Sequence, residues 1–265
     1  VGYTSGSAFI FKRTSGTENW TNTEQITATP VTGGLFGRSV SIYGDYAIVG
    51  TVGPDGEPAG GGRAHIFKRT SGTENWTLQE TFTGDISDHF GSSVAISGDY
   101  AIVGAKEWDG NLGTRQGAAY IYKRTSGTEN WTEEAIIYST DNTEGGEKSY
   151  FGYSVDIYDD YAVVGAYRTN PEGGANKGSA YIFNRSGTTW SQQVRVVADN
   201  QFSNAYFGSA VAIYGDYVIV GQGRISTSSS ASIDSSAYIF KAGVSTYQQK
   251  GYAIGISNEK VEFRL

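Results

Sequence analysis

The chain repeats one phrase four times, and this repetition restricts the fold more than any other feature of the sequence. Each copy opens with Phe-Gly, continues through Ser or Ala, Val and Ile, turns at Gly-Asp-Tyr or Asp-Asp-Tyr, and ends in Val-Gly. The copies begin at Phe36, Phe90, Phe151 and Phe207, with spacings of 54, 61 and 56 residues. Self-similarity at such a period is the signature of a repeat architecture. We therefore expect the shared residues to build a scaffold and the differences between copies to carry function.

A second phrase follows each copy and also opens the chain, and together the two phrases predict four strands per repeat. In the second copy, residues 93–96 and 101–104 are β-branched runs separated by a Gly-Asp turn, which is typical of a hairpin. Residues 118–122 and 131–137 predict the third and fourth strands. Four antiparallel strands that are apolar on both faces indicate a blade of a β-propeller, packed between its neighbours. No helical periodicity is evident.

The two ends of the chain predict one more blade. Residues 7–11 and the strand from Trp20 correspond to the third and fourth strands of a blade without a first half, and residues 251–263 align with residues 152–164. We expect these halves to form one composite blade, which would remove the free sheet edges. A fragment of a longer repeat array is the alternative, because Lys250 stands where Phe is expected.

The predicted fold is thus an all-β, five-bladed β-propeller of four-stranded antiparallel blades, closed by a composite blade from the N- and C-termini. It forms a single domain over residues 1–265. The expected blades are approximately 36–85, 90–140, 151–200, 207–250, and 251–265 plus 1–30.

Composition excludes several classes of function. The net charge of −7 argues against a nucleic-acid partner and against adsorption to an anionic membrane. The absence of cysteine excludes disulfides, thiol catalysis and cysteine-bound zinc. Methionine is also absent, even at position 1, which indicates a processed or trimmed chain, most simply one without its signal peptide. A sequence numbered from its first ordered residue explains the absence equally well. No apolar run reaches the ~18 residues that a bilayer span needs. We predict an extracellular or cell-surface location.

The Phe-Gly opening, the valine-rich hairpin and the closing Val-Gly-Ala of residues 103–105 and 164–166 resemble the FG-GAP repeat. That family builds the β-propeller of integrin α-chains and of many secreted or surface propellers in microbes, some of them lectins. The resemblance covers nearly the whole chain and implies a propeller, but a propeller hosts many unrelated activities.

The chain departs from this family in its potential for metal binding. Many FG-GAP blades carry an acidic Asp-x-Asp-x-Asp-Gly loop that binds calcium, but the hairpin turns here are reduced to dipeptides such as Gly44-Asp45. One or two carboxylates cannot supply the six to eight oxygen ligands of calcium. We therefore predict no cofactor. The remaining calcium candidates lie in longer loops, at Glu107, Asp109, Asp141 and Glu144.

Strand order separates a uniform face of the disc from a variable face. Turns after the first and third strands lie on one face, which carries Gly-Asp and the sequence Thr-Ser-Gly-Thr-Glu-Asn, repeated verbatim three times. Connections after the second and fourth strands lie on the other face. Because binding sites occur on variable loops held by a rigid scaffold, we expect the ligand on this second face. Its long connections span residues 52–62, 106–117, 167–178 and 221–235.

Aromatic residues on this loop face are the candidate ligand contacts. The residue before Phe-Gly is Leu35, His89, Tyr150 or Tyr206, so three of four copies place a flat ring there. Flat rings can stack on sugars, while neighbouring polar groups bind the hydroxyls. Trp108, beside Asp109 and Asn111, is the only Trp outside the strand-opening position. These rings could equally cover the core. The other four tryptophans recur in register and are expected to be structural: Trp20, Trp76, Trp131 and Trp190.

The uniform face carries candidate glycosylation sites. Asn19, Asn75, Asn130 and Asn184 each begin an Asn-x-Ser/Thr acceptor pattern. The first three recur in the same turn, so repeat duplication explains the pattern equally well.

Catalysis finds little support in the sequence. His65 stands where other copies have Phe or Tyr, so we expect it to replace a packing ring, and His89 has no assignable Ser/His/Asp partners. Acidic loop pairs can cut glycosidic bonds, but no spacing singles out a pair. We predict a non-enzymatic, lectin-like or adhesion module that binds a glycan or an extracellular protein. The alternative is a structural subunit of a filament or surface layer with homotypic contacts, and a homo-oligomer is left open.

Overall fold

The computed structural model describes residues 6–27, 34–53, 61–110, 115–140, 148–170, 175–198, 202–223, 235–241, 254–257 and 260–263. Its regular structure within these ranges is β-strand, and no membrane-spanning helix is found there. The strands are β1 Ala8–Arg13, β2 Trp20–Ile26, β3 Leu35–Tyr43, β4 Tyr46–Val52, β5 Arg63–Arg69, β6 Trp76–Thr83, β7 Phe90–Ser97, β8 Tyr100–Ala105, β9 Ala118–Arg124, β10 Trp131–Ile137, β11 Phe151–Tyr158, β12 Tyr161–Ala166, β13 Ser179–Ser186, β14 Thr189–Val196, β15 Phe207–Tyr214, β16 Tyr217–Gln222, β17 Ser236–Lys241, β18 Ile254–Ser257 and β19 Lys260–Phe263.

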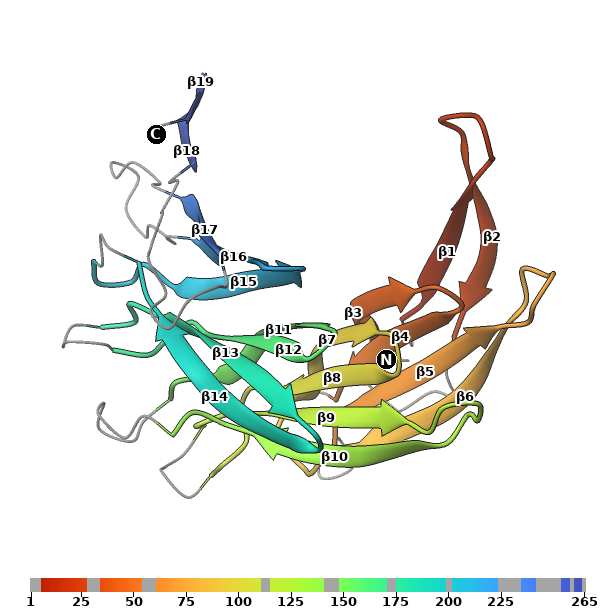
Figure 1. Cartoon of the computed structure of the whole chain (residues 1–265), viewed down its shortest axis with the longest axis horizontal. Coiled ribbons are helices and arrows are strands. Elements are labelled where there is room, and N and C mark those ends of the chain that lie inside the picture. Colours follow the sequence, from red (N-terminus) through yellow and green to blue (C-terminus); the bar gives the residue numbers. More distant parts are fainter. Residues whose placement is uncertain are drawn as a thin grey trace, which may run out of the picture.

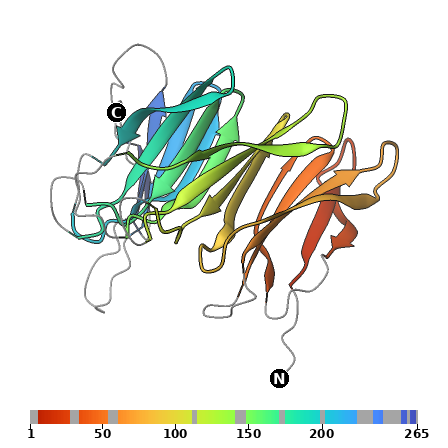
Figure 2. The ribbon, with the colours of Figure 1, turned by 90° about the horizontal axis from the view of Figure 1, so that it is seen from below.

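The strands form antiparallel blades, as the repeats predict. Blade 1 (β3–β6), blade 2 (β7–β10) and blade 3 (β11–β14) are four-stranded sheets in sequential order, and blade 4 (β15–β17) has three described strands. The blades stand side by side along an arc (Figures 1 and 2). The predicted all-β propeller of four-stranded blades is therefore confirmed.

The Gly-Asp-Tyr phrase forms the turn between the first two strands of each blade. Gly44, Gly98 and Gly215 adopt positive φ angles of 57°, 58° and 55° in these turns, and Asp159 takes the same position with a φ of 49°. Glycine enters this conformation without steric cost, and Asp is among the few other residues that tolerate it. The predicted hairpins are confirmed.

The Phe-Gly phrase builds a bulge and a contact between blades. Phe90 is fully buried, and the register of β7 against β8 shifts between Phe90 and Ser93. The same shift recurs at the start of β3, β11 and β15. Gly91 has a φ of +81°, and a Cβ there would lie 2.2 Å from the carbonyl oxygen of Arg63 in blade 1. This position therefore requires glycine for both its conformation and the close approach of the neighbouring blade.

The closing Val-Gly and the Ser of the first strand join each blade to the next. A Cβ on Gly104 would lie 2.1 Å from the carbonyl oxygen of Gly152, in blade 3. The same carbonyl accepts a hydrogen bond of 2.8 Å from Ser93 Oγ. Equivalent Ser-to-Gly bonds join blade 1 to blade 2 and blade 3 to blade 4. The repeated residues thus serve the stacking of the blades.

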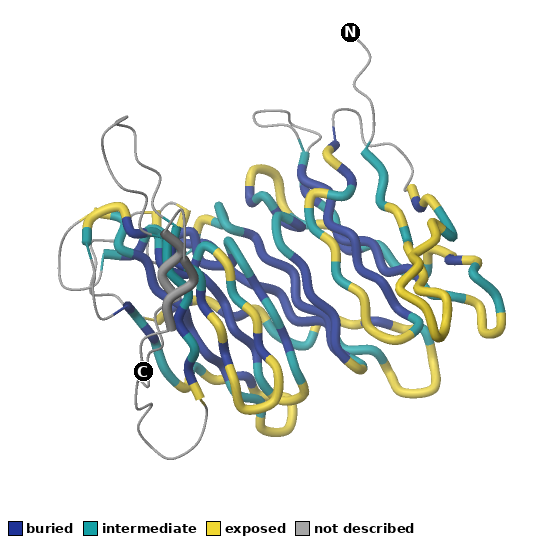
Figure 3. The backbone as a smooth tube through the Cα atoms, turned by 90° about the horizontal axis from the view of Figure 1, so that it is seen from above, coloured by how far each residue is buried: buried dark blue, intermediate teal, exposed yellow. Residues whose placement is uncertain are grey.

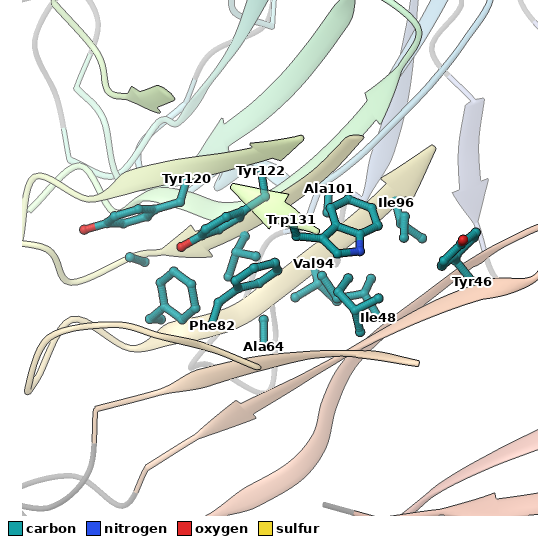
Figure 4. Packing of buried hydrophobic residues seen from close by; sticks show 14 of the residues in the cluster. Tyr46, Ile48, Ala64, Phe82, Val94, Ile96, Ala101, Tyr120, Tyr122 and Trp131 are labelled. Atoms are coloured by element: carbon teal, nitrogen blue, oxygen red, sulfur yellow. The ribbon is translucent and has the colours of Figure 1, made fainter. Parts of the chain in front are cut away.

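The core lies between the blades rather than within one sheet. Blades 1 and 2 bury a shared cluster in which the rings of Phe82 and Tyr122 stack at 3.7 Å (Figure 4). Similar clusters join blades 2 and 3 and blades 3 and 4. Figure 3 shows buried residues along the strands and exposed residues at the turns. His65 is buried beside Phe36, with ring centroids 5.5 Å apart, so its predicted packing role is confirmed.

The predicted composite blade is not assembled in this structure. The N-terminal half-blade (β1–β2) and the pair β18–β19 are separate two-stranded sheets, on opposite sides of the open part of the arc (Figure 1). The exposure of the tryptophans follows from this. Trp76, Trp131 and Trp190 are buried between blades, as expected, whereas Trp20 is 62% exposed because no blade in the described part of the chain covers it.

Candidate functional site

The loops that precede Phe-Gly share one backbone conformation in three blades. His89, Tyr150 and Tyr206 have positive φ angles of 53°, 53° and 52°. The residue two positions earlier is also left-handed in each loop, with φ between 62° and 72°. Such angles cost energy in non-glycine residues. Because the conformation recurs whatever the side chain, it belongs to the scaffold and points each of these residues in an equivalent direction.

The predicted ring of open stacking surfaces does not form at Tyr150. Its side chain is only 5% exposed, and the Arg168 guanidinium lies 5.0 Å from its ring centroid. The Tyr167 ring centroid is 5.5 Å away. Tyr206 is half-buried, 5.6 Å from Tyr167. Leu35, which has no ring, is exposed. Tyr150 therefore helps to hold the loops together and offers little ring surface to a ligand.

Glu107 is the charged centre of the loop between β8 and β9. Its carboxylate lies 2.7 Å from Lys106 Nζ and 3.2 Å from Arg115 Nε. The Nδ1 atom of His89 is 3.6 Å from the same carboxylate, and Arg115 Nη1 donates a hydrogen bond of 3.2 Å to the Tyr150 hydroxyl. This network connects the loops of blades 2 and 3 and fixes the Glu107 carboxylate.

The calcium candidates are not brought together in the described part of the chain. Three basic groups face the Glu107 carboxylate, and Asp109 Oδ1 accepts a hydrogen bond of 2.7 Å from the Arg115 backbone N–H. Among the described residues there is no group of three His, Cys, Asp or Glu side chains that could hold a metal ion. Asp141 and Glu144 lie outside the described residues. Calcium binding at those positions stays a prediction.

Trp108 lies beside these charged groups. Its indole stacks on the Tyr138 ring with centroids 5.7 Å apart and is partly buried against the cluster between blades 1 and 2. Its backbone N–H and carbonyl bond to Ala105 and Gly117, so the loop holds it at both ends. Asp109 is exposed next to it, and Asn111 lies outside the described residues. Trp108 is thus held in a fixed position in the loop between β8 and β9, as a ligand contact would require.

The residue that the sequence reasoning missed is Asp88. It is only 8% exposed, and its Oδ2 atom is buried without a hydrogen-bond partner among the residues that the structure describes. Burial, and then the charges of Asp85 and Asp109, raise the pKa of this carboxyl to about 6, while His89 has a smaller opposite effect. Burial likewise raises the pKa of the neighbouring Tyr120 to about 12, with a contribution from Asp88.

A comparison between copies could have drawn attention to Asp88. The equivalent position, two residues before Phe, is Gly34, Ser149 or Ala205 in the other blades. The backbone contact is shared, because the Asp88 carbonyl accepts from Glu107 N–H as the Ser149 carbonyl accepts from Arg168 N–H. The carboxyl group is therefore an addition specific to blade 2. A carboxyl group at a position where the other three repeats have small residues is the sequence signal that points to Asp88.

On the opposite face, three of the four acceptor patterns share an exposed turn. Asn19, Asn75 and Asn130 are exposed. Asn184 instead lies within β13, and its side-chain amide donates to the Asp160 carbonyl at 3.4 Å. The four asparagines are therefore not equivalent.

Comparison with known proteins identifies the repeat. A family model described as FG-GAP repeat matches residues 20–67, 76–122, 131–183 and 190–240. Each match runs from the fourth strand of one blade to the third strand of the next. No curated protein matches the chain.

Among solved structures, the GH43 endo-arabinanase from Bacillus licheniformis is similar, with 12% identity and a TM-score of 0.44, over 94% of this chain and 91% of that one. That protein is an enzyme, and this finding corrects the prediction of a non-enzymatic binding module, together with its filament-subunit alternative. A likeness this distant carries no argument about chemistry. The chemistry of the present chain has to be inferred from its own residues.

Proposed function

This chain belongs to the FG-GAP repeat family, whose shared residues build the scaffold, and we propose that it hydrolyses a glycosidic bond through the loop face of blade 2. Asp88 is the proton donor in this proposal. The observation that carries it is the Asp88 carboxyl group, present at this position in one blade, whose buried Oδ2 atom has no hydrogen-bond partner among the described residues and whose pKa is raised to about 6.

Asp88 has the properties of a general acid. Proton donation in a transition state is most effective when the pKa of the acid lies near the working pH. An ordinary Asp is ionised at pH 6, whereas burial leaves about half of Asp88 protonated there. The proton would pass to the oxygen that leaves when the bond to the anomeric carbon breaks.

A second carboxylate is needed on the other side of the bond. Asp109 is the candidate, because it is exposed and remains close enough for its charge to act on Asp88. Its Oδ1 atom is oriented by the Arg115 N–H, which leaves Oδ2 to deprotonate a water or to attack the anomeric carbon. Two carboxyl groups in different environments, one buried and one exposed, are what acid and base roles require.

The surrounding groups fit a carbohydrate. Trp108 supplies a fixed indole next to Asp109, and aromatic rings with a few polar groups are typical of sugar sites. Glu107, held by Lys106 and Arg115, sets the shape of the loop. The glycan partner and the extracellular location predicted from the sequence become part of this proposal, since many polymeric glycans lie outside cells.

The test is hydrolysis of a panel of neutral and acidic polysaccharides, read as new reducing ends. We expect activity on at least one polymer, falling above pH 6 as Asp88 loses its proton. The Asp88→Asn variant should lose activity about 100-fold or more. Asp216→Asn, in a hairpin turn on the opposite face, is the matched control and should keep it. Full activity in Asp88→Asn, or no hydrolysis of any polymer by the native chain, would refute the proposal.

A further inference from the structure

Arg168, in the loop between β12 and β13, lies against a cluster of tyrosine rings. Its guanidinium carbon is 5.0 Å from the centroid of the Tyr150 ring and 5.3 Å from that of the Tyr167 ring. The Tyr167 ring also lies 4.1 Å from the Tyr153 ring and 5.6 Å from the Tyr206 ring, measured between centroids. A cation is attracted to the faces of aromatic rings. These rings, from blades 3 and 4, therefore hold the guanidinium in a fixed place on the loop face.

No carboxylate pairs with this guanidinium among the residues that the structure describes. The Arg168 side chain is half-buried, and its Nε atom is buried without a hydrogen-bond partner in the same part of the chain. Arg185, on the opposite face, also lies near a tyrosine, 4.7 Å from the Tyr100 ring, but it pairs with Asp160. Removing a cation from water without a counter-charge costs free energy. Arg168 thus has the ring contact of Arg185 without its anion.

Blade 2 carries the opposite charge at the equivalent position. Glu107, like Arg168, stands three residues after the glycine of the closing Val-Gly, and the backbone N–H of each bonds to the loop before Phe-Gly. Glu107 faces three basic side chains: His89, Lys106 and Arg115. The residues at the corresponding positions around Arg168 are neutral: Tyr150, Tyr167 and Asn176. Blade 3 therefore reverses the charge without supplying a counter-charge.

The surroundings of Arg168 are continuous with the proposed acid and base. The Arg115 side chain donates a hydrogen bond of 3.2 Å to the Tyr150 hydroxyl, and the Arg115 backbone N–H donates to Asp109 Oδ1 at 2.7 Å. Lys106 Nζ lies 5.8 Å from the Tyr150 ring centroid. Glu107 pairs with Lys106 and Arg115, which leaves Arg168 as the uncompensated cation of this group. In a chain with a net charge of −7, this part of the loop face can still attract an anion.

We propose that Arg168 binds an acid group of the glycan, a carboxylate or a sulfate ester, on a sugar unit next to the one at Asp109. This inference rests on the proposed function, which makes a glycan the ligand of the loop face. The guanidinium fork can donate two parallel hydrogen bonds to such a group. The hydroxyl groups of Tyr153, Tyr167 and Tyr206 make no hydrogen bond to the described residues, and hydroxyl groups of this kind can donate to the remaining oxygens.

The test is native gel electrophoresis in gels that contain a polysaccharide, at pH 7.5, where the proposed proton donor is ionised. Polygalacturonate supplies carboxylates and dextran sulfate supplies sulfate esters. Methyl-esterified polygalacturonate and dextran are the matched neutral polymers. We expect one of the charged polymers, but neither neutral one, to retard the native chain. The more strongly retarding polymer identifies the acid group.

Variants connect this binding to Arg168. Arg168→Gln should weaken binding to the charged polymer about 10- to 100-fold, because it removes a charge-assisted hydrogen bond. Arg168→Lys keeps the charge but loses the fork, so its affinity should be intermediate. Arg185→Gln removes an arginine that also lies near a tyrosine ring, on the opposite face, and should bind like the native chain. The Tm of each variant shows whether it is folded.

Three outcomes would overturn the proposal: no retardation by either charged polymer, equal retardation by a charged polymer and its neutral counterpart, or equal affinity in the native chain and Arg168→Gln. The second comparison needs no variant, so it holds even if Arg168→Gln does not fold. Binding that depends on Arg168, without hydrolysis of any polymer, would refute the proposed hydrolysis and leave the acid-group site standing. Hydrolysis without such binding would do the reverse.

Discussion

Replacing Asp88 by Asn should change the pH dependence of stability in a direction that the structure fixes. The pKa of Asp88 is about 6 in the folded chain against an ordinary value of 3.8. Between these values the folded state binds more protons than the unfolded state. Stability from this group is therefore present below pH 3.8 and is lost as the pH rises through 6. Asn cannot ionise, so Asp88→Asn should escape this loss.

The magnitude follows from the shift. A difference of about 2 pKa units corresponds to ~3 kcal/mol when it acts fully. Asp88 keeps 8% of its surface exposed, and solvent screening reduces the value, so we expect ~2 kcal/mol. At pH 7.5, Asp88→Asn should then be more stable than the native chain by about this amount, or roughly 4–8 °C in Tm. At pH 4 the difference in stability between the two chains should shrink to the pH-independent effect of replacing the carboxyl group by an amide.

The assay is urea denaturation of both chains at pH 4.0, 5.5 and 7.5, followed by Trp fluorescence. The quantity of interest is the change with pH in the difference between the two free energies of unfolding. Other titrating groups, such as Asp156 and His65, affect both chains equally and cancel. Asp216→Asn, an exposed carboxylate, should show no such change. A difference that stays constant from pH 4.0 to 7.5, or that grows towards low pH, would refute the raised pKa and with it the proton-donor role.

Three further predictions follow from the packing. Gly104→Ala should lower the free energy of unfolding, measured by urea denaturation, by ~3 kcal/mol or more, because its Cβ would strike a backbone carbonyl of blade 3. The control Gly98→Ala has no described heavy atom within 4 Å of its Cβ, and it should cost only ~1 kcal/mol for its positive φ. Trp131→Ala should cost about 3–5 kcal/mol in the same assay, because the ring is buried between blades 1 and 2, and a cost below 1 kcal/mol would contradict that placement. Burial, and to a lesser extent the Arg63 charge, lower the pKa of His65 to about 4 from 6.5. The free energy of unfolding should therefore fall as the pH drops from 6.5 to 4, and His65→Tyr should reduce that fall by ~2 kcal/mol. An equal fall in the native chain and in His65→Tyr would show that the buried imidazole is not its cause.

Much of the fold could be read from the repeats because it rests on local chemistry. The Gly-Asp turn needs a positive φ, and alternation of apolar residues fixes the strands on either side of it. Phe90 and Gly91 repeat because each blade needs a buried ring and a position without Cβ against the previous blade. Such requirements act between neighbours and recur in every copy, so they leave a periodic trace in the sequence.

The site could be read only in part. The contrast between variable and uniform connections in the sequence predicted the loop face and Trp108 as a candidate contact. The sequence did not predict the burial of Tyr150, since that burial depends on Arg168 and Tyr167, which the fold brings against its ring. Asp88 escaped notice because a carboxylate in a polar loop is ordinary until its surroundings are known. Its raised pKa comes from burial and from the charges of Asp85 and Asp109.

The sequence by itself determined the strands, the turns, the four repeats and the family, because each depends on residues close in the chain or on a pattern repeated along it. Only the tertiary structure decided which side chains meet across blades. It placed a buried Asp88 beside an exposed Asp109, and it left Trp20 and Tyr217 uncovered at the two ends of the arc. Burial and the distance between charges are properties of the folded chain, since they depend on residues from different blades, and for that reason no local pattern encodes them.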